Sequence, residues 1–313
     1  MPAINQLRIP SLRGAAAAIL LATTTTIGLT AQEGNESKPQ KPDAIERTTM
    51  DYTTTSRLVG AKVFLEASAK ETAEARRDGE QPDRPTAKVT EWLVDCRDGQ
   101  LKQAVVSLGG FLGLGDKVVL VPAADLRWNN SMERYDLAWT KEELKGKPSF
   151  DLATACKNGL DAACGIHADK AGEGKGTAEA SVARGKKVPG TDFVGCSQCM
   201  HKASDLSALP VYAGSTEWGK VQDLIVDRNK NCIVLAVVNH GSTLGMGGKD
   251  YLVAYPKVTA CQKDGDAQVL CCASGMTAAQ LESCVPFVKP KNGVVDPAAA
   301  KKALEGVEPK AKN

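Results

Sequence analysis

The sequence predicts an all-β protein built from two similar antiparallel β-units. Sliding the 313-residue chain on itself by 132 residues makes 14 of the 34 positions from 88 to 121 identical without a gap. Each copy also consists of short apolar blocks rich in valine and leucine, which turn residues separate. Because self-similarity at a fixed period outranks any local motif, we expect an internal duplication.

Within the first copy, the apolar runs at 89–95 and 101–108 flank Asp98-Gly99, a dipeptide typical of hairpin turns. A glycine-rich loop then leads to a third strand at 117–121. The spacing of these glycines does not fit a dinucleotide-binding loop, and a strand follows them where such a loop needs a helix. We therefore expect each copy to be a small antiparallel β-unit.

Three stretches of the first unit resemble the PRC-barrel domain, a family found in the photosynthetic reaction-centre H subunit and the ribosome maturation factors. They are L-x-G-x-x-V-F at 58–64, K-V-x-x-x-L-V-D at 88–95 and V-S-x-G-G-F-L-G-x-G-D-K-x-V-x-V-P at 106–122. Residues 204–287 resemble the family more loosely. The resemblance implies two small PRC-barrel-like antiparallel β-barrels.

Both units end with the pattern of a helix N-terminus. Thr140 and Thr277 are each followed three residues later by Glu or Gln, which is the spacing of a capping box. We therefore expect a short helix to close each barrel. Asp296-Pro297 predicts the N-cap and first position of one more helix in the C-terminal tail.

The composition changes along the chain divide it into six expected segments. These are a signal peptide at 1–31, a disordered lead-in at 32–55, the first PRC-barrel-like domain at 56–150, a cysteine-bearing linker at 151–203, the second domain at 204–287, and a polar tail with a short helix at 288–313. The apolar stretch before Ala31 is short for a membrane span, and a polar segment follows it at once. We expect cleavage near Ala31, no stable membrane span afterwards, and a periplasmic or secreted protein; a retained membrane anchor is the alternative.

The charge of the mature chain argues against nucleic acid as a partner. The first 31 residues hold two arginines and no acidic residue, so their removal leaves 37 basic and 37 acidic side chains. Phosphate binding needs a concentrated basic surface, which a balanced composition does not indicate.

Ten cysteines form the strongest chemical signal. In an oxidising compartment an even number indicates disulfides first. The disulfide candidates are Cys96, Cys156, Cys164, Cys196, Cys199, Cys232, Cys261, Cys271, Cys272 and Cys284. A bridge between Cys96 and Cys232 would leave four cysteines in the linker and four in the second unit to pair locally. The competing pairing joins Cys96 to a linker cysteine.

Two other uses of the linker cysteines are open. Zinc is bound in proteins by cysteine and histidine side chains, and a closely spaced cysteine pair can also work as a redox-active dithiol. The candidate metal ligands are Cys156, Cys164, His167, Cys196, Cys199 and His201.

Acidic residues recur at matching positions of the two copies. Glu91 and Asp95 lie four residues apart on an expected strand, as do Asp223 and Asp227, so each pair shares one face. One interpretation is a cation site. The other is a solvent-facing strand edge on which Asp95 and Asp227 accept turn N–H groups.

We find no pattern of a nucleophile, a general base or a metalloprotease in the chain. The family resemblance implies a non-catalytic protein-interaction or assembly role, with an unidentified protein partner and no cofactor. Two separate barrel cores are expected, filled by Leu58, Val63, Val94, Val105 and Leu120 and by their counterparts Leu206, Val211, Val226, Val237 and Leu252.

The signal-peptide assignment predicts the N-terminus of the mature protein. N-terminal sequencing of the chain purified from its native source should begin near Gln32, because small residues such as Ala31 precede signal cleavage sites. A mature chain that still begins at Met1 would contradict this assignment.

Overall fold

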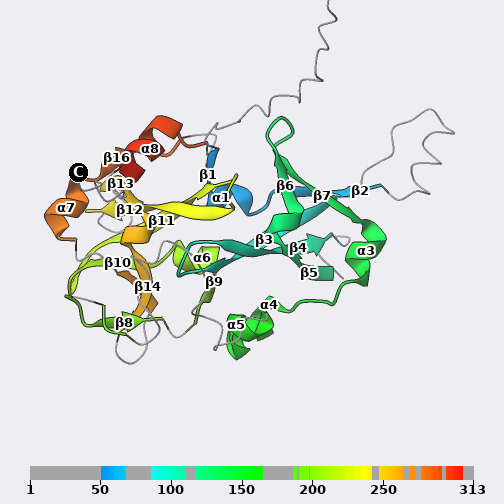
Figure 1. The fold of residues 1–313 in the computed structure, drawn as a ribbon, viewed down its shortest axis with the longest axis horizontal. Helices are drawn as coiled ribbons and strands as arrows, with labels where there is room; N and C mark the ends of the chain where they lie inside the picture. The colour runs from blue at the N-terminus through cyan, green and yellow to red at the C-terminus, as the bar shows by residue number, and fades with distance from the viewer. Residues whose placement is uncertain are drawn as a thin grey trace, which may run out of the picture. The chain divides into compact units, whose positions relative to one another are not determined.

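The computed structural model describes residues 51–67, 86–109, 117–164, 186–188, 190–196, 198–241, 247–263, 268–271, 276–290 and 294–305. Strands predominate among these residues and form two curled sheets, with short helices at their edges (Figure 1). The predicted β-rich character of the chain is therefore confirmed. The expected signal peptide and most of the expected lead-in lie outside the described residues.

Among the described residues, the first sheet has seven strands in the order β5-β4-β3-β2-β7-β6, and β9 pairs with β3. Neighbouring strands are antiparallel, except that β2 is parallel to β7. The hairpin between β3 and β4 turns at Asp98-Gly99, as the sequence predicts. The strands are β2 Lys62–Glu66, β3 Thr86–Asp95, β4 Leu101–Leu108, β5 Lys117–Pro122, β6 Leu126–Asn129 and β7 Arg134–Thr140, with a 3₁₀ turn at Ala123–Asp125.

In the part of the chain that the structure describes, the second sheet has nine strands in the order β16-β13-β12-β11-β10-β15-β14-β8, and β1 pairs with β11. Its bounds are β8 Phe193–Gly195, β10 Pro210–Ala213, β11 Thr216–Asp227, β12 Cys232–His240, β13 Lys249–Ala254, β14 Thr259–Lys263, β15 Gln268–Cys271 and β16 Val285–Phe287, with a 3₁₀ turn at Tyr255–Lys257. Among the described residues, no strand pairing joins the two ends of either sheet.

A short strand before each unit, and the helix that begins the unit, contact the sheet of the other unit. The strand β1, Tyr52–Thr54, pairs with β11 and leads into the helix α1, Thr55–Leu58. Conversely, the strand β9, Met200–Lys202, pairs with β3 and leads into the helix α6, Ala203–Leu206. Parts of the expected lead-in and linker are therefore strands of the two sheets.

The two equivalent hairpins also bond to each other. The Leu101 amide donates to the Asn231 carbonyl at 2.8 Å, and the Ile233 amide donates to the Gly99 carbonyl at 2.8 Å. A Cβ atom at Gly99 would lie 2.7 Å from the Ile233 carbonyl oxygen, and the Gly99 φ of 72° also favours glycine. The turn glycine is therefore required by the contact between hairpins as well as by the turn.

One hydrophobic cluster contains core residues of both units, so the expectation of two separate cores is wrong. We call α1 and α6 the exchanged helices, because each contacts the sheet of the other unit. They contribute to the shared cluster through Leu58 of α1 and Leu206 of α6. The cluster includes Leu58, Val63 and Val94 of the first unit and Leu206, Val211 and Val226 of the second. Each of these side chains is at most 1% exposed.

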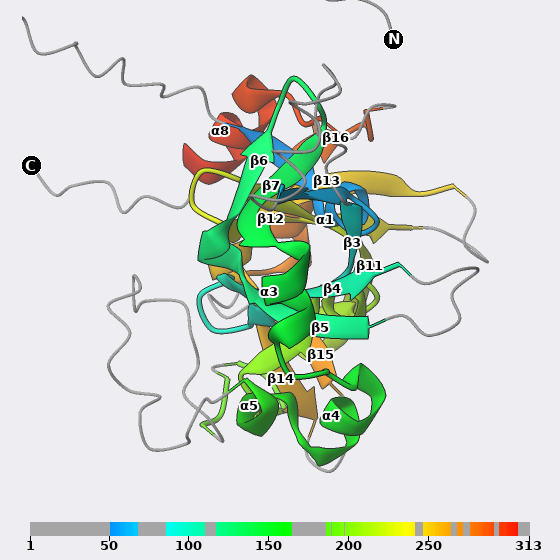
Figure 2. The same ribbon diagram turned by 90° about the vertical axis from the view of Figure 1, so that its right-hand side faces the viewer.

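The outer faces of the sheets hold the remaining predicted core residues. Val105 packs with the linker helices α4, Leu152–Asn158, and α5, Leu160–Ala163, which lie side by side in Figure 2. Val237 and Leu252 pack with the C-terminal helix α8, Pro297–Glu305. Leu120 is partly buried against the same cluster as Val105.

The predicted helix starts are confirmed. Both side chains of the capping box bond to the backbone in α3, Lys141–Gly146, after Thr140, and in α7, Ala278–Glu282, after Thr277. Asp296 accepts a hydrogen bond from the Ala298 amide at 3.0 Å at the start of α8. In the part of the chain that the structure describes, no helix combines the length and hydrophobicity that crossing a bilayer requires.

The shared core predicts that the two sheets unfold together. Leu58→Ala should lower the free energy of unfolding by about 2–5 kcal/mol, because it leaves a cavity in a fully buried site. Urea unfolding followed by circular dichroism should show one transition. Val59→Ala, at a partly exposed neighbouring position, is the control and should change the midpoint little. Two separate transitions, with only one moved by Leu58→Ala, would contradict the shared core.

Candidate functional site

The repeated acidic residues are buried, which corrects the expectation of a solvent-facing strand edge. Glu91, Asp95, Asp223 and Asp227 are each at most 6% exposed. Strand bulges explain part of this, since the register shifts between Val89 and Glu91 and at the matching place in the second sheet. A buried carboxylate is costly unless hydrogen bonds satisfy it, so the partners of these groups matter.

Asp223 holds the first turn of α1 against the second sheet. Its carboxylate accepts hydrogen bonds from the Thr55 hydroxyl at 3.0 Å, the Ser56 amide at 3.2 Å and the Ser56 hydroxyl at 2.5 Å. The ammonium group of Lys289 lies 2.9 Å from the same carboxylate. A carboxylate with this many donors fixes the exchanged helix in place.

Glu91 plays the equivalent part in the first sheet. Its carboxylate accepts a hydrogen bond from the Trp92 amide at 2.9 Å and another from the Ser204 hydroxyl of α6. Glu91 and Asp223 are 132 residues apart, and Ser56 and Ser204 are 148 residues apart. The repeated acids are thus attachment points for the exchanged helices.

The second acid of each pair accepts turn N–H groups, as the sequence predicts. Asp95 accepts from the Arg97 amide at 3.1 Å, and Asp227 accepts from the Asn229 amide at 3.0 Å. The Arg97 guanidinium lies 2.6 Å from Asp95. Burial alone would raise the pKa of Asp95, but the hydrogen bonds and charge of Arg97 outweigh it and hold this pKa below its usual value.

Three thiols gather where β9 meets the end of β3. Cys96, Cys196 and Cys199 are buried, and the Cys96 amide donates to the Cys199 carbonyl at 2.8 Å. The Cys96 thiol donates to the Gln198 carbonyl at 3.7 Å. Burial first, and then the nearby Cys196 and Asp95, raise the pKa of the Cys96 thiol well above its usual value. The Cys96 thiol is therefore protonated and weakly nucleophilic at neutral pH.

The proposed bridge between Cys96 and Cys232 is not formed. Both are free thiols, and the Cys232 thiol donates to the Asp98 carbonyl at 3.3 Å although the two hairpins do meet. Cys261 is disulfide-bonded, while Cys272 and the side chain of Cys271 lie outside the described residues. Cys156, Cys164, Cys196, Cys199 and Cys284 also form no disulfide.

The candidate metal ligands do not gather into a site in the part of the chain that the structure describes. No group of three histidine, cysteine or acidic side chains there could hold a metal ion. His201 is buried beside the Gln198 carbonyl, 3.3 Å from its ring nitrogen, and burial lowers the pKa of its imidazole. His167 lies outside the described residues.

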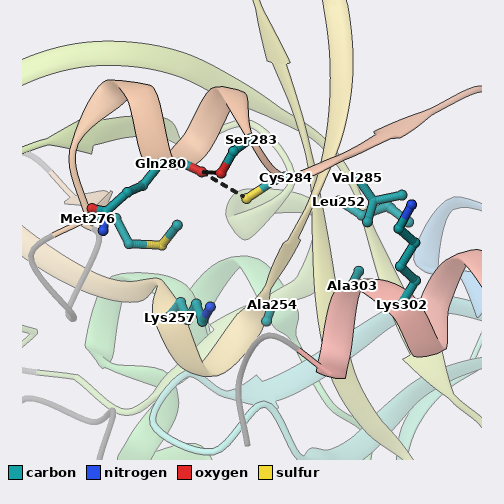
Figure 3. A pocket seen from close by; sticks show the side chains of 10 residues that line it. All are labelled: Leu252, Ala254, Lys257, Met276, Gln280, Ser283, Cys284, Val285, Lys302 and Ala303. Carbon is teal, nitrogen blue, oxygen red and sulfur yellow. Dashed lines mark hydrogen bonds between the residues drawn. The ribbon is translucent and has the colours of Figure 1, made fainter.

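A pocket of about 570 Å³ opens beside Cys284, between α7 and α8. Figure 3 shows its lining, in which the Cys284 thiol donates to the Gln280 carbonyl at 3.6 Å. Burial raises the pKa of this thiol. The pocket is lined by Leu252, Ala254, Lys257, Met276, Gln280, Ser283, Cys284, Val285, Lys302 and Ala303. This arrangement offers a mixed polar and apolar surface but no activated nucleophile.

A smaller pocket, of about 230 Å³, was not foreseen from the sequence. It combines two arginines with a tryptophan, and its lining residues are Asp51, Arg57, Trp128, Asn130, Glu133, Arg228 and Val294. We call it the arginine pocket. The sequence signal that could have found it is weak, because arginine is common on any solvated surface.

Comparison with protein families matches one segment of the chain. The family model of the PRC-barrel domain matches residues 200–270, a segment that runs from β9 to β15. The resemblance to the PRC-barrel domain is therefore confirmed for this segment. The match does not extend to the first unit. A comparison with curated proteins gave no match.

The lowered pKa of Asp95 predicts acid-dependent stability. Since unfolded Asp95 titrates near pH 4, its contribution to stability is present above that pH and is lost as the pH falls through the lower pKa of the folded state. The free energy of unfolding, measured by urea titration between pH 2 and pH 6, should fall less steeply in Asp95→Asn than in the native chain. The exposed control Asp125→Asn should keep the native slope. An unchanged slope in Asp95→Asn would refute the assignment.

Proposed function

We propose that this chain is an exported, non-catalytic protein-interaction or assembly module built from two PRC-barrel-like domains. The observation that carries the proposal is the PRC-barrel domain at residues 200–270, since this domain suggests a protein-interaction module. The internal repeat supports a second such domain in residues 56–150, with each barrel closed by a short helix, α3 or α7, and the cysteine-bearing linker between them.

Export is supported by the composition of residues 1–31. This segment has two arginines, no acidic residue and a run of alanine and leucine, which is typical of a signal peptide. We therefore propose that the mature chain works in the periplasm or outside the cell.

The surface around the arginine pocket supports a protein partner. Among the described residues, Val59, Met132, Val288 and Val294 are the exposed large hydrophobic side chains. Val294 lines the pocket, while Val59 and Met132 lie within two residues of lining residues along the chain. Tryptophan and arginine, which also line the pocket, are the residue types most enriched at the energetic centres of protein interfaces.

A thiol-redox or metal-binding protein is the second candidate. The gathering of Cys96, Cys196 and Cys199 favours the thiol-redox form of this alternative. Incubation with oxidised glutathione tests it: transfer of oxidising equivalents to a pair of these thiols would support it, with two molecules of reduced glutathione released per disulfide. Burial raises the pKa of Cys196 to about 11, so we expect slow reaction and prefer the interaction role.

Chemical cross-linking in the native envelope, followed by affinity capture of the full chain, tests the interaction role. A partner should be captured in near-stoichiometric yield, and Met132→Glu should reduce that yield about tenfold, because it places a charge on an apolar contact. Val288→Glu introduces the same charge at an exposed position elsewhere and serves as the control. Capture that is absent, or that both variants reduce equally, would contradict an interface at this surface.

A further inference from the structure

The pocket between α7 and α8 has an apolar floor of the size that small ligands fill. Leu252 and Ala254 of β13 are buried in it, at 1% and 3% exposed, and Val285 of β16 and Ala303 of α8 are partly buried beside them. Figure 3 shows these side chains around the cavity. Its volume of about 570 Å³ lies within the range of small-molecule sites, roughly 300–1,000 Å³.

The neutral polar groups on the α7 side of this pocket are bonded among themselves. The Ser283 hydroxyl donates to the Gln280 carbonyl at 2.7 Å, and the Cys284 thiol donates to the same carbonyl at 3.6 Å. The Gln280 side-chain oxygen accepts a hydrogen bond from the Thr277 amide at 2.8 Å. These groups gain little from a ligand, so the charged side chains of the lining decide which polar group the pocket binds.

The charge of the lining is positive. It contains Lys257 and Lys302 and no acidic residue. Glu282 and Glu305, the acidic residues of α7 and α8, do not line the pocket, and each lies within 4.0 Å of a basic side chain elsewhere. In Figure 3 the Lys302 side chain extends from α8 along the apolar wall. Because opposite charges attract, a ligand of this pocket should be apolar over most of its length and negatively charged at one end.

We propose that the pocket between α7 and α8 binds a small amphipathic anion, with its aliphatic chain against Leu252 and Ala254 and its acidic head group beside Lys257 and Lys302. The inference goes beyond the proposed interaction function and does not depend on it. An added peptide strand fits less well, because Pro286 of the end strand β16 has no N–H group to donate.

Alkylation of the pocket thiol tests the proposal in the full chain. Cys284 lines the pocket, so a bound ligand should shield it from iodoacetamide, and mass spectrometry can follow each thiol separately. Decanoate below its micelle concentration should slow alkylation of Cys284 at least fivefold in a saturable way. The exposed thiol of Cys156 is the control and should react at an unchanged rate. No protection of Cys284, or equal slowing at Cys156, would overturn the proposal.

Two further probes test the chemistry of the ligand. Decanol has the same chain without the charge and should bind at least tenfold more weakly than decanoate. A blocked leucine-glutamate-leucine tripeptide carries the same charge on a peptide and should also bind at least tenfold more weakly. Equal binding of decanol would mean that the charge plays no part, and equal binding of the tripeptide would mean that the pocket suits a partner protein. Either result would overturn the proposal.

Matched lysine variants locate the head group. Lys302→Gln should weaken binding of decanoate at least fivefold. Lys301→Gln removes the same charge from the preceding residue of α8, which pairs with Glu305 and does not line the pocket, and should change binding less than twofold. Circular dichroism should show that both variants remain folded. Equal effects of the two variants would mean general attraction of anions and would overturn the proposal. The interaction function is tested at a different surface, so it stands or falls separately.

Discussion

The structure depends on how two buried carboxylates find hydrogen-bond donors. Glu91 and Asp223 lie on β3 and β11, where an unsatisfied carboxylate would strongly destabilise the fold. Each accepts a hydrogen bond from a serine of a short helix that belongs in sequence to the other unit, Ser204 or Ser56. Those helices reach their carboxylates because β9 and β1 pair with the opposite sheets. The exchange of elements and the burial of the acids therefore require each other, and both join the sheets into one folding unit.

Local features of the fold could be predicted from sequence, while the exchange could not. The hairpin at Asp98-Gly99 and the starts of the helices after Thr140, Thr277 and Asp296 follow from short-range chemistry, and the structure contains them. A period of two identifies the face to which a side chain points but does not identify the sheet to which a strand belongs. The segments at 52–55 and 200–203 are short, so their polar surroundings favoured a lead-in and a linker.

The candidate site was harder to predict because it forms from residues far apart in the chain. Arg228 and Asp51 meet only because β1 pairs with β11. The first sheet has an equivalent backbone contact. The Arg228 amide donates to the Asp51 carbonyl at 2.9 Å, and at the matching position the Cys96 amide donates to the Cys199 carbonyl at 2.8 Å. The two units thus share a backbone arrangement but place an ion pair in one site and thiols in the other. A comparison of the repeats reveals this difference only after the exchange is known.

Native-state hydrogen exchange tests most directly whether the exchanged elements make the two sheets one unit. The slowest amides of β3 and β4 and those of β11 and β12 should exchange through openings of the same free energy, equal to that of global unfolding measured with urea. The amides of Leu101 and Ile233, which join the two hairpins, should belong to this slowest group. The account would be contradicted if the slowest amides of one sheet opened with a free energy more than about 1 kcal/mol below that of the slowest amides of the other. The sheets would then unfold separately.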